Sequence, residues 1–337
     1  MSFISIGDLS RGFALRSQNA EIKARLTRLS SELASGQTAD PAARVRGDFR
    51  PLAAIARSLA VMDAYDLAGA EAALTTDAMQ TALGQLTDAA QTLGSSLVQA
   101  ASMPDGRMLS AVGNETRERL EGAVSALNTR VAGRALFAGA ETDGAALLDG
   151  ATILSTVTTQ VAGLGTASDI MDVLDTWFDT PGGGFDALAY QGSDLPAGPV
   201  RLAEGQSLTL DVKASDPAVR GMLKALVAGA LLADPGTLNG DTAARAALAR
   251  RAGEGLLTAE APLTALRADI GTTQAHIETI QAQNAAHRGL LELAQADILA
   301  VDPYETATEI EAVQTQLETL YTVTARLSRL SLANYLT

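Results

Sequence analysis

The sequence predicts a mainly α-helical protein, in which both termini form a long antiparallel helical bundle or coiled coil, with a small central α+β, β-rich insertion domain. Hydrophobic residues make up 47% of the 337 residues but aromatic residues only 4%, so the apolar content consists of alanine, leucine, valine and isoleucine, which favours helix packing. Leucines near both ends recur at heptad-type spacings. After Gly133, glycine, threonine and aspartate become frequent and the helical periodicity weakens.

The N-terminal segment, residues 1–40, is predicted to contain one helix with a narrow apolar seam. Gly36 can end this helix. The seam positions are spaced by 7, 4, 3 and 4 residues, as in a heptad repeat, and are Leu15, Ile22, Leu26, Leu29 and Leu33.

Residues 41–135 are predicted to form the N-terminal part of a helical rod. Asp40-Pro41 has the chemistry of a helix cap followed by a first turn, and a long helix is expected over residues 51–97. Pro104-Asp105-Gly106 predicts a turn. After that turn, residues 109–131 are expected to run back as an antiparallel helix.

Residues 136–240 are predicted to form a central α+β outer domain. Weak periodicity favours short strands and turns at residues 152–161. The alternation of apolar and polar residues over 200–212 predicts a strand or a hairpin. We expect the apolar helix that follows, residues 217–233, to cover these strands.

Residues 241–301 are predicted to form the C-terminal part of the rod, with an interruption or restart at Pro262. Residues 302–337 are predicted to form a C-terminal helix, because Asp302-Pro303 supplies a cap and a proline at the first helical position. The apolar positions of this helix are Ile310, Val313, Leu317, Leu320, Val323, Leu327, Leu330 and Leu332.

A helix with only a narrow apolar seam must bury that seam against another helix, because helix propensity alone contributes little stability. Two such seams lie at opposite ends of this chain. The simplest arrangement pairs the two terminal helices and leaves the middle as an insertion. Both seams are therefore candidate sites for contact with partner helices.

The formal net charge of -14 and the pI of about 4.6 argue against nucleic acid and anionic membranes as partners. The chain contains no cysteine, which excludes disulfides and thiolate metal sites. It has no run of 18 apolar residues, so no membrane-spanning helix is expected. Its first residues lack the pattern of a secretory signal.

The sequence offers no arrangement typical of an enzyme, a cofactor site or a metal site. Its two histidines, His276 and His287, lie eleven residues apart, too far along one helix to share a metal ion, and His287 is expected to pack on the helix seam. Gly182-Gly183-Gly184 lacks the lysine of a phosphate loop and predicts a turn. A local basic cluster suits either a solvated helix face or pairing with a neighbouring subunit, and consists of Arg44, Arg46, Arg50 and Arg57.

Three stretches of the sequence resemble the bacterial flagellin family, and most closely its hook-associated proteins of the hook–filament junction. They are LTRLSSELASG at residues 26–36 with Asp40-Pro41-Ala42 after it, GRALFAG at residues 133–139, and ARLSRLSLANYL at residues 325–336. The single Asp40 before Pro41 and the ending in Leu-Ser-Leu and Tyr-Leu resemble the junction protein more than a filament subunit. The likeness is weak in the middle of the chain.

The resemblance implies a non-enzymatic structural subunit that joins hook to filament by polymerising through its terminal helices. Implied partners are flagellin, a neighbouring hook-associated protein on the hook side, further copies of itself in a ring, and a flagellar export chaperone on the C-terminal segment. Type III flagellar export and a place in the extracellular, secreted flagellum are also implied. The alternative within the family is flagellin itself, the filament subunit.

Two alternatives outside this family fit the sequence less well. An amphipathic protein of lipid or granule surfaces would also be rich in alanine and helix, but basic residues would flank a wide apolar face. A helical enzyme would need convergent polar groups in its central domain, and residues 140–240 contain no histidine or cysteine.

Overall fold

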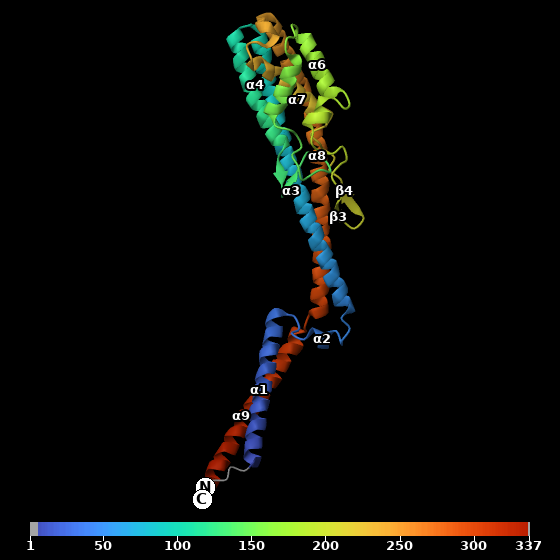
Figure 1. The fold of residues 1–337 in the computed structure, drawn as a ribbon. Coiled ribbons are helices and arrows are strands. Elements are labelled where there is room, and N and C mark those ends of the chain that lie inside the picture. Colours follow the sequence, from blue (N-terminus) through green and yellow to red (C-terminus); the bar gives the residue numbers. More distant parts are fainter. Residues whose placement is uncertain (1–5, 336–337) are drawn as a thin grey trace. The chain divides into compact units, whose positions relative to one another are not determined.

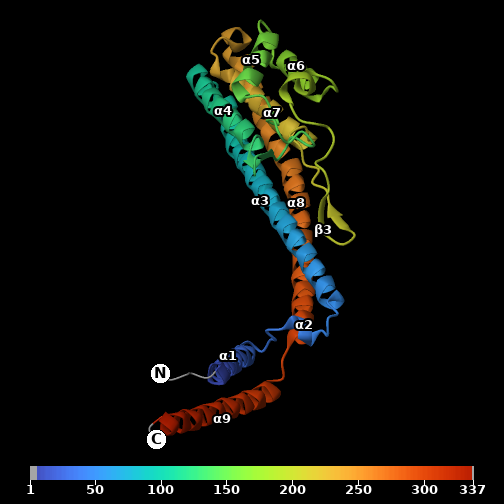
Figure 2. The same cartoon turned by 60° about the horizontal axis from the view of Figure 1, so that its bottom comes forward.

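The computed structural model describes residues 6–335, except for the side chains of residues 6–9, 11 and 328–335. The chain divides into two compact units: a terminal unit of residues 1–62 and 285–337, and a central unit of residues 63–284. Helices dominate both units (Figures 1 and 2). In chain order the main helices are α1 (Ile6–Ser35), α2 (Pro41–Arg44), α3 (Arg50–Ser102), α4 (Gly106–Leu127), α5 (Gly150–Val161), α6 (Ala167–Asp179), α7 (Pro217–Ala230), α8 (Thr242–Leu299) and α9 (Pro303–Tyr335).

The remaining elements are short and belong to the central unit. Two antiparallel hairpins pair β1 with β2 and β3 with β4. The predicted fold class, a mainly α protein with a small β-containing insertion, is confirmed. The short elements are β1 (Arg130–Val131), β2 (Arg134–Ala135), η1 (Phe185–Ala189), β3 (Val200–Ala203), β4 (Gln206–Leu208), η2 (Leu231–Ala233) and η3 (Thr237–Gly240).

In the terminal unit, α1 and α9 pack side by side (Figure 1). The segments at their inner ends are tied together, because the N–H of Thr38 donates to the carbonyl of Leu299 at 2.9 Å and the N–H of Val301 donates to Gly36 at 3.0 Å. Gly36 has a φ of +70°, as expected at the end of a helix. The Asp302 carboxylate accepts the N–H of Tyr304 at 2.8 Å, which confirms the predicted start of α9.

In the central unit, α3 and α8 run antiparallel and approach closely because glycines face each other. A Cβ placed on Gly253 would lie 2.9 Å from the carbonyl oxygen of Gly94, so alanine at that position would push the two helices apart. Further along the pair, the Gln80 side chain donates to the carbonyl of Arg267 at 2.7 Å. Apolar and polar contacts together fix the register of these helices.

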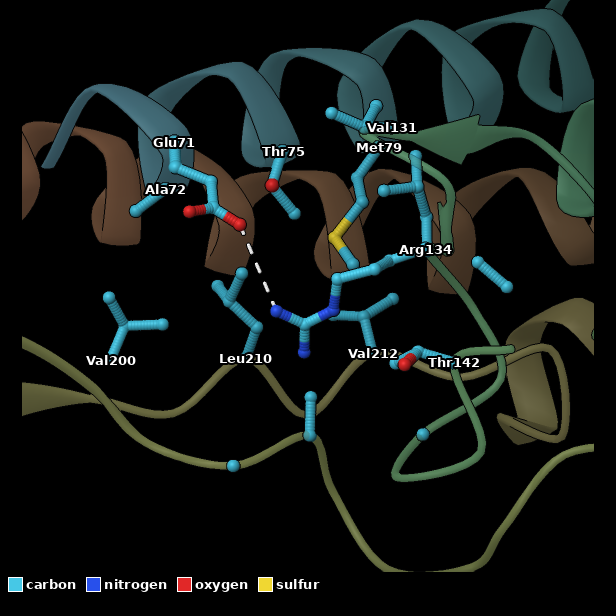
Figure 3. A pocket seen from close by; sticks show the side chains of 15 residues that line it. Glu71, Ala72, Thr75, Met79, Val131, Arg134, Thr142, Val200, Leu210 and Val212 are labelled. Atoms are coloured by element: carbon cyan, nitrogen blue, oxygen red, sulfur yellow. Dashed lines mark ion pairs between the residues drawn. The ribbon is translucent and has the colours of Figure 1, made fainter. Parts of the chain in front are cut away.

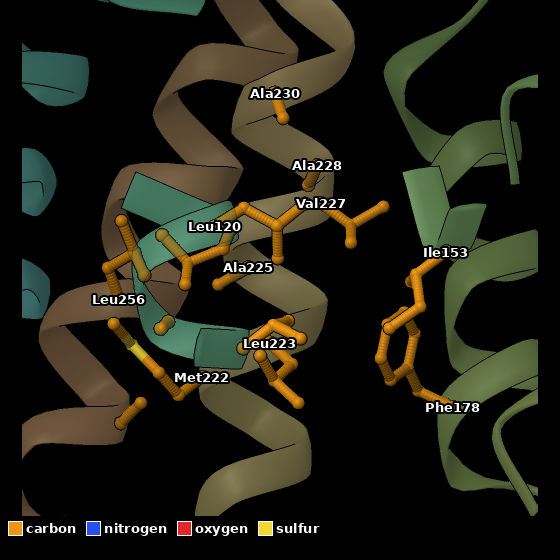
Figure 4. Close-up of a cluster of buried hydrophobic side chains, with 14 of the residues drawn as sticks. Leu120, Ile153, Phe178, Met222, Leu223, Ala225, Val227, Ala228, Ala230 and Leu256 are labelled. Carbon is orange, nitrogen blue, oxygen red and sulfur yellow. The ribbon is translucent and has the colours of Figure 1, made fainter. Parts of the chain in front are cut away.

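The core of the central unit lies where α4 and α7 meet α5, α6 and α8 (Figure 4). Met222 and Leu223 of α7 are fully buried, with Leu120 of α4 and Leu256 of α8 near one side and Phe178 of α6 near the other. The expected role of the 217–233 helix as a cover for strands is therefore wrong. It forms the centre of a helical bundle, because most of its side chains are apolar and every residue from Ala225 to Ala230 is buried.

Residues 150–161 form the helix α5, so the expectation of strands and turns at 152–161 is wrong. The Asp149 side chain accepts the N–H of Thr152 at 2.8 Å and caps the helix. Ile153, Val157 and Val161 recur every four residues and are buried. Cap and spacing outweigh the strand preference of the β-branched side chains in this segment.

The predicted hairpin within residues 200–212 is confirmed as β3 and β4, with Val200 opposite Leu208. It lies against α3 and α8, where Leu202 packs with Ala72, Ile277 and Ile280. The side chain of Asn284 donates to the carbonyl of Leu202 at 2.7 Å in a buried position. This bond ties the hairpin to α8.

Two helix boundaries differ from the prediction. The structure keeps α8 continuous through Pro262, which lies on an exposed face between the buried Ala259 and Leu263. Water can therefore reach the carbonyl of Thr258 that the proline leaves without a donor. The helix α4 ends at Leu127 instead of near Val131, because residues 130–135 form the β1–β2 hairpin.

Two glycines of α4 provide a matched test of this packing. A Cβ on Gly113 would overlap the backbone of Leu232 and Ala233, whereas a Cβ on Gly122 meets nothing within 4 Å. We expect Gly113→Ala to lower the free energy of unfolding by about 1–3 kcal/mol and Gly122→Ala to raise it by up to about 1 kcal/mol. Denaturation followed by the fluorescence of the single tryptophan, the buried Trp177, measures both changes. Equal effects of the two substitutions would contradict the packing of α4.

Candidate assembly interface

The predicted seam residues of α1 and α9 lie on facing sides of one antiparallel helix pair. Leu29 of α1 and Val313 and Leu320 of α9 are buried, with Val313 only 1% exposed. Leu15, Ile22, Leu26, Ile310 and Leu317 are half-buried. The structure thus brings most of the two predicted seams together.

The seams become more exposed toward the chain termini. Val323 and Leu327, in the outer half of α9, are 43% and 42% exposed. The side chains of Leu330 and Leu332 lie outside the described residues. Within the terminal unit, the described hydrophobic side chains that are buried are Leu29, Met62, Val313 and Leu320.

Leu33 departs from the expected seam. Its side chain is exposed, and the neighbouring Glu32 takes the buried position. The Glu32 carboxylate accepts the N–H of Ala39 at 2.9 Å, so this last turn of α1 is used to hold the segment that follows it. The heptad spacing could not reveal that Glu32 is buried in place of Leu33, because it gives no information on where the chain turns.

An open groove of about 630 Å³ lies between the middle parts of α1 and α9. Leu15 and Ile22 line it from α1, and Leu320 and Val323 line it from α9. The groove is shallow and borders on polar side chains such as Gln18 and Thr319. Its apolar floor suits the side chains of another helix more than a small molecule that needs enclosure.

Polar contacts across the pair are few and exposed. Arg25 and Glu309 form an ion pair at 3.1 Å with both side chains nearly half exposed, and such pairs contribute little stability. The Lys23 ammonium lies 6.0 Å from the centre of the Tyr321 ring. Hydrogen bonds with Asn19 and Lys23 lower the pKa of Tyr321. Apolar burial, more than charge, must therefore hold the two helices together.

The central unit contains a small cavity of about 130 Å³ between α3, the β1–β2 hairpin and the segment that follows β4 (Figure 3). Its walls are apolar, with Met79 and Leu210 among the lining residues. At its edge Arg134 points toward Glu71, with 3.8 Å between nitrogen and oxygen. Sites for small molecules usually measure about 300–1,000 Å³, so this cavity is small for one.

The part of the chain that the structure describes places no three histidine, cysteine, aspartate or glutamate side chains where they could hold a metal ion. His276 and His287 are both exposed. The expected packing of His287 on the seam is wrong, because Asn284 is the buried residue one turn after Ile280. No helix among the described residues is long and apolar enough to cross a membrane.

Several exposed apolar side chains were not identified as candidate contact residues from the sequence. Phe49, directly before α3, is 47% exposed, and Leu67 and Leu74 of α3 are 72% and 57% exposed. The two leucines are seven residues apart, the spacing of one face of a helix. Spacing alone does not distinguish a buried face from an exposed one.

The chain is similar to one family model and to solved structures of flagellar proteins. Residues 255–336 match the model of the bacterial flagellin C-terminal helical region. No curated protein matches the sequence. Among solved structures, FlgL from Bacillus cereus is 18% identical with a TM-score of 0.49, over 71% of this chain and 96% of that chain. A putative flagellar hook-associated protein from Vibrio parahaemolyticus is 13% identical with a TM-score of 0.50, over 73% of this chain and 95% of that chain.

The likeness to the Vibrio parahaemolyticus protein shows a shared fold. The family match covers α9 and the part of α8 from residue 255 onward, and so includes the C-terminal seam described above. Residues 255–336 of the chain are therefore a flagellin-type C-terminal helical region, and the chain shares its fold with a putative flagellar hook-associated protein.

Proposed function

We propose that the protein joins the flagellar hook to the filament as a hook-associated subunit, and that it polymerises through its terminal helices. The observation that carries this proposal is the incomplete burial of the α1–α9 seam, which leaves Val323 and Leu327 exposed at its outer end. The flagellin-type C-terminal region and the hook-associated name of a protein with this fold support the same function.

The low stability expected of the terminal unit favours further burial of its apolar seam by neighbouring subunits. A two-helix pair with few buried apolar side chains is marginally stable on its own. Full burial of a leucine or valine side chain contributes roughly 1.5–3 kcal/mol. Covering the outer seam in an assembly therefore offsets the entropy lost when the terminal helices become ordered.

The proposed partners follow from this interface. Further copies of the chain in a ring would cover the outer seams, with flagellin on the filament side and another hook-associated protein on the hook side. Before assembly, an export chaperone would cover the apolar face of α9 during secretion through the flagellar export channel. The protein would then act outside the cell, as part of the extracellular flagellum.

Deleting the gene separates this function from that of a filament subunit. We expect cells with hooks that lack filaments and with flagellin released into the medium, as seen by electron microscopy and by analysis of the culture supernatant. Reintroducing the chain should restore filaments. Normal filaments in the deletion strain, or hooks without filaments and without released flagellin, would contradict the junction function.

Substitutions in α9 separate assembly from folding of the subunit. Leu327→Asp places a charge on the exposed outer seam, so we expect at least about tenfold fewer filaments per cell with unchanged helix content by circular dichroism. Val313→Asp buries an unpaired carboxylate, so we expect loss of α1–α9 helix content as well. In both variants the fluorescence of Trp177 in the central unit should stay native.

Thr322→Asp is the matched control. Thr322 is an exposed polar residue in the same turn as Val323, so this substitution adds the same charge without replacing a seam residue. It should assemble like the unmodified chain. Assembly by Leu327→Asp at the level of this control would show that the outer seam is not a contact surface.

A further inference from the structure

A basic connector, residues 39–57, joins α1 to the first turns of α3 and has an unusual composition for this chain. It contains four arginines and two aspartates, and so carries a net positive charge in a protein whose net charge is -14. Phe49 lies among these arginines and is 47% exposed. Arginine and aromatic residues are the types enriched where proteins bind one another.

Hydrogen bonds order the basic connector, both within the segment and to its neighbours Glu32 and Ile298, and no layer of side chains covers it. Asp40 accepts the N–H of Ala43 at 3.1 Å, and Asp48 accepts both the N–H and the guanidinium of Arg50. These bonds lower the pKa of Asp48. None of residues 39–57 is buried. The segment therefore presents a defined shape whose charged and aromatic groups face solvent.

A surface of opposite charge lies on α3 in the central unit. Residues 63–102 contain five carboxylates and no lysine or arginine. Leu67, Glu71, Leu74 and Asp77 lie within about a third of the helix circumference and form what we call the acidic stripe. Its two leucines are 72% and 57% exposed.

Within the chain, the charged side chains of the basic connector and of the acidic stripe form only weak ion pairs or hydrogen bonds with nearby residues. The oxygen of Glu71 lies 3.8 Å from Arg134, beyond hydrogen-bond distance, with both side chains about half exposed. Asp77 accepts a hydrogen bond from the neutral Gln274. The Arg50 side chain that binds Asp48 is 90% exposed. Exposed pairs of this kind contribute little and are readily exchanged.

We propose that the basic connector of one copy docks on the acidic stripe of α3 in a neighbouring copy. This inference rests on the proposed function, in which copies of the chain stand side by side. Arg46 and Arg50 would pair with Glu71 and Asp77, and the Phe49 ring would lie between Leu67 and Leu74. These leucines are about 10 Å apart along the helix axis, which leaves room for one ring.

The complementary surfaces favour a second copy as the occupant. Both lie on the same chain, and a head-to-tail interface between identical subunits brings two different surfaces together at every contact. Such an interface continues from copy to copy until the ring closes. The apolar centre with charged groups around it has the composition of specific protein interfaces.

Cysteine cross-linking tests the contact directly, because the chain has no cysteine of its own. Arg46→Cys and Asp77→Cys are placed on separate copies that are expressed together, and flagella are isolated and oxidised. We expect a covalent dimer that requires both variants and disappears on reduction. Arg46→Cys with Thr159→Cys, an exposed position of α5, is the matched control and should give no dimer.

If both variants are present in the flagella and no dimer forms, or if the control pair gives as much dimer, the proposed contact is wrong. If the unmodified chain fails to restore filaments to the deletion strain, the proposed function itself is wrong. The two failures are thus distinguishable.

Charge reversal provides a second measurement that does not depend on cross-linking geometry. Arg46→Glu with Arg50→Glu should reduce the number of filaments per cell about tenfold, and so should Glu71→Lys with Asp77→Lys. Combining all four substitutions in one chain should recover most of the loss, because opposite charges face each other again. Absence of recovery, with Trp177 fluorescence native in every variant, would overturn the contact.

Discussion

The antiparallel pairing of α1 and α9 is the interaction on which the proposed behaviour of this protein depends. It joins the two ends of a chain of 337 residues through a seam that is narrow on both helices. Backbone hydrogen bonds between residues 36–38 and 299–301 and the buried Leu29 and Val313 hold its inner part. Its outer part keeps apolar side chains in contact with water. Because pairing of α1 with α9 leaves these apolar side chains uncovered, they are suited to contact with another subunit.

The central unit supplies the stability that the terminal pair lacks. Its bundle buries most of α7 and the rings of Trp177, Phe178 and Phe185, whereas the described part of the terminal unit buries four hydrophobic side chains. The free energy of unfolding can therefore be much larger for the central unit than for the terminal unit, because local stability follows the number of buried contacts. A subunit of this kind has a stable body and a marginal pair of helices that a neighbour can complete.

The sequence was sufficient for most of the helices and for most positions of the two seams, because apolar spacing and caps such as Asp302 are local signals. It was not sufficient where tertiary burial decided between alternatives. The β-branched segment 152–161 became helix once Asp149 capped it and its apolar face met the bundle. Glu32 replaced Leu33 at the buried end of α1, and Leu67 and Leu74 face solvent despite their heptad spacing. Periodicity shows that a face is apolar but not whether the same chain covers it.

Amide hydrogen exchange of α1 and α9, compared between the purified subunit and isolated flagella, shows whether neighbouring subunits complete the helix pair. We expect rapid exchange in the outer parts of both helices in the purified subunit, slow exchange in α4 and α7, and strong protection of α1 and α9 after assembly. Equal protection of α1, α9, α4 and α7 in the purified subunit, with no change in flagella, would contradict completion by a neighbour.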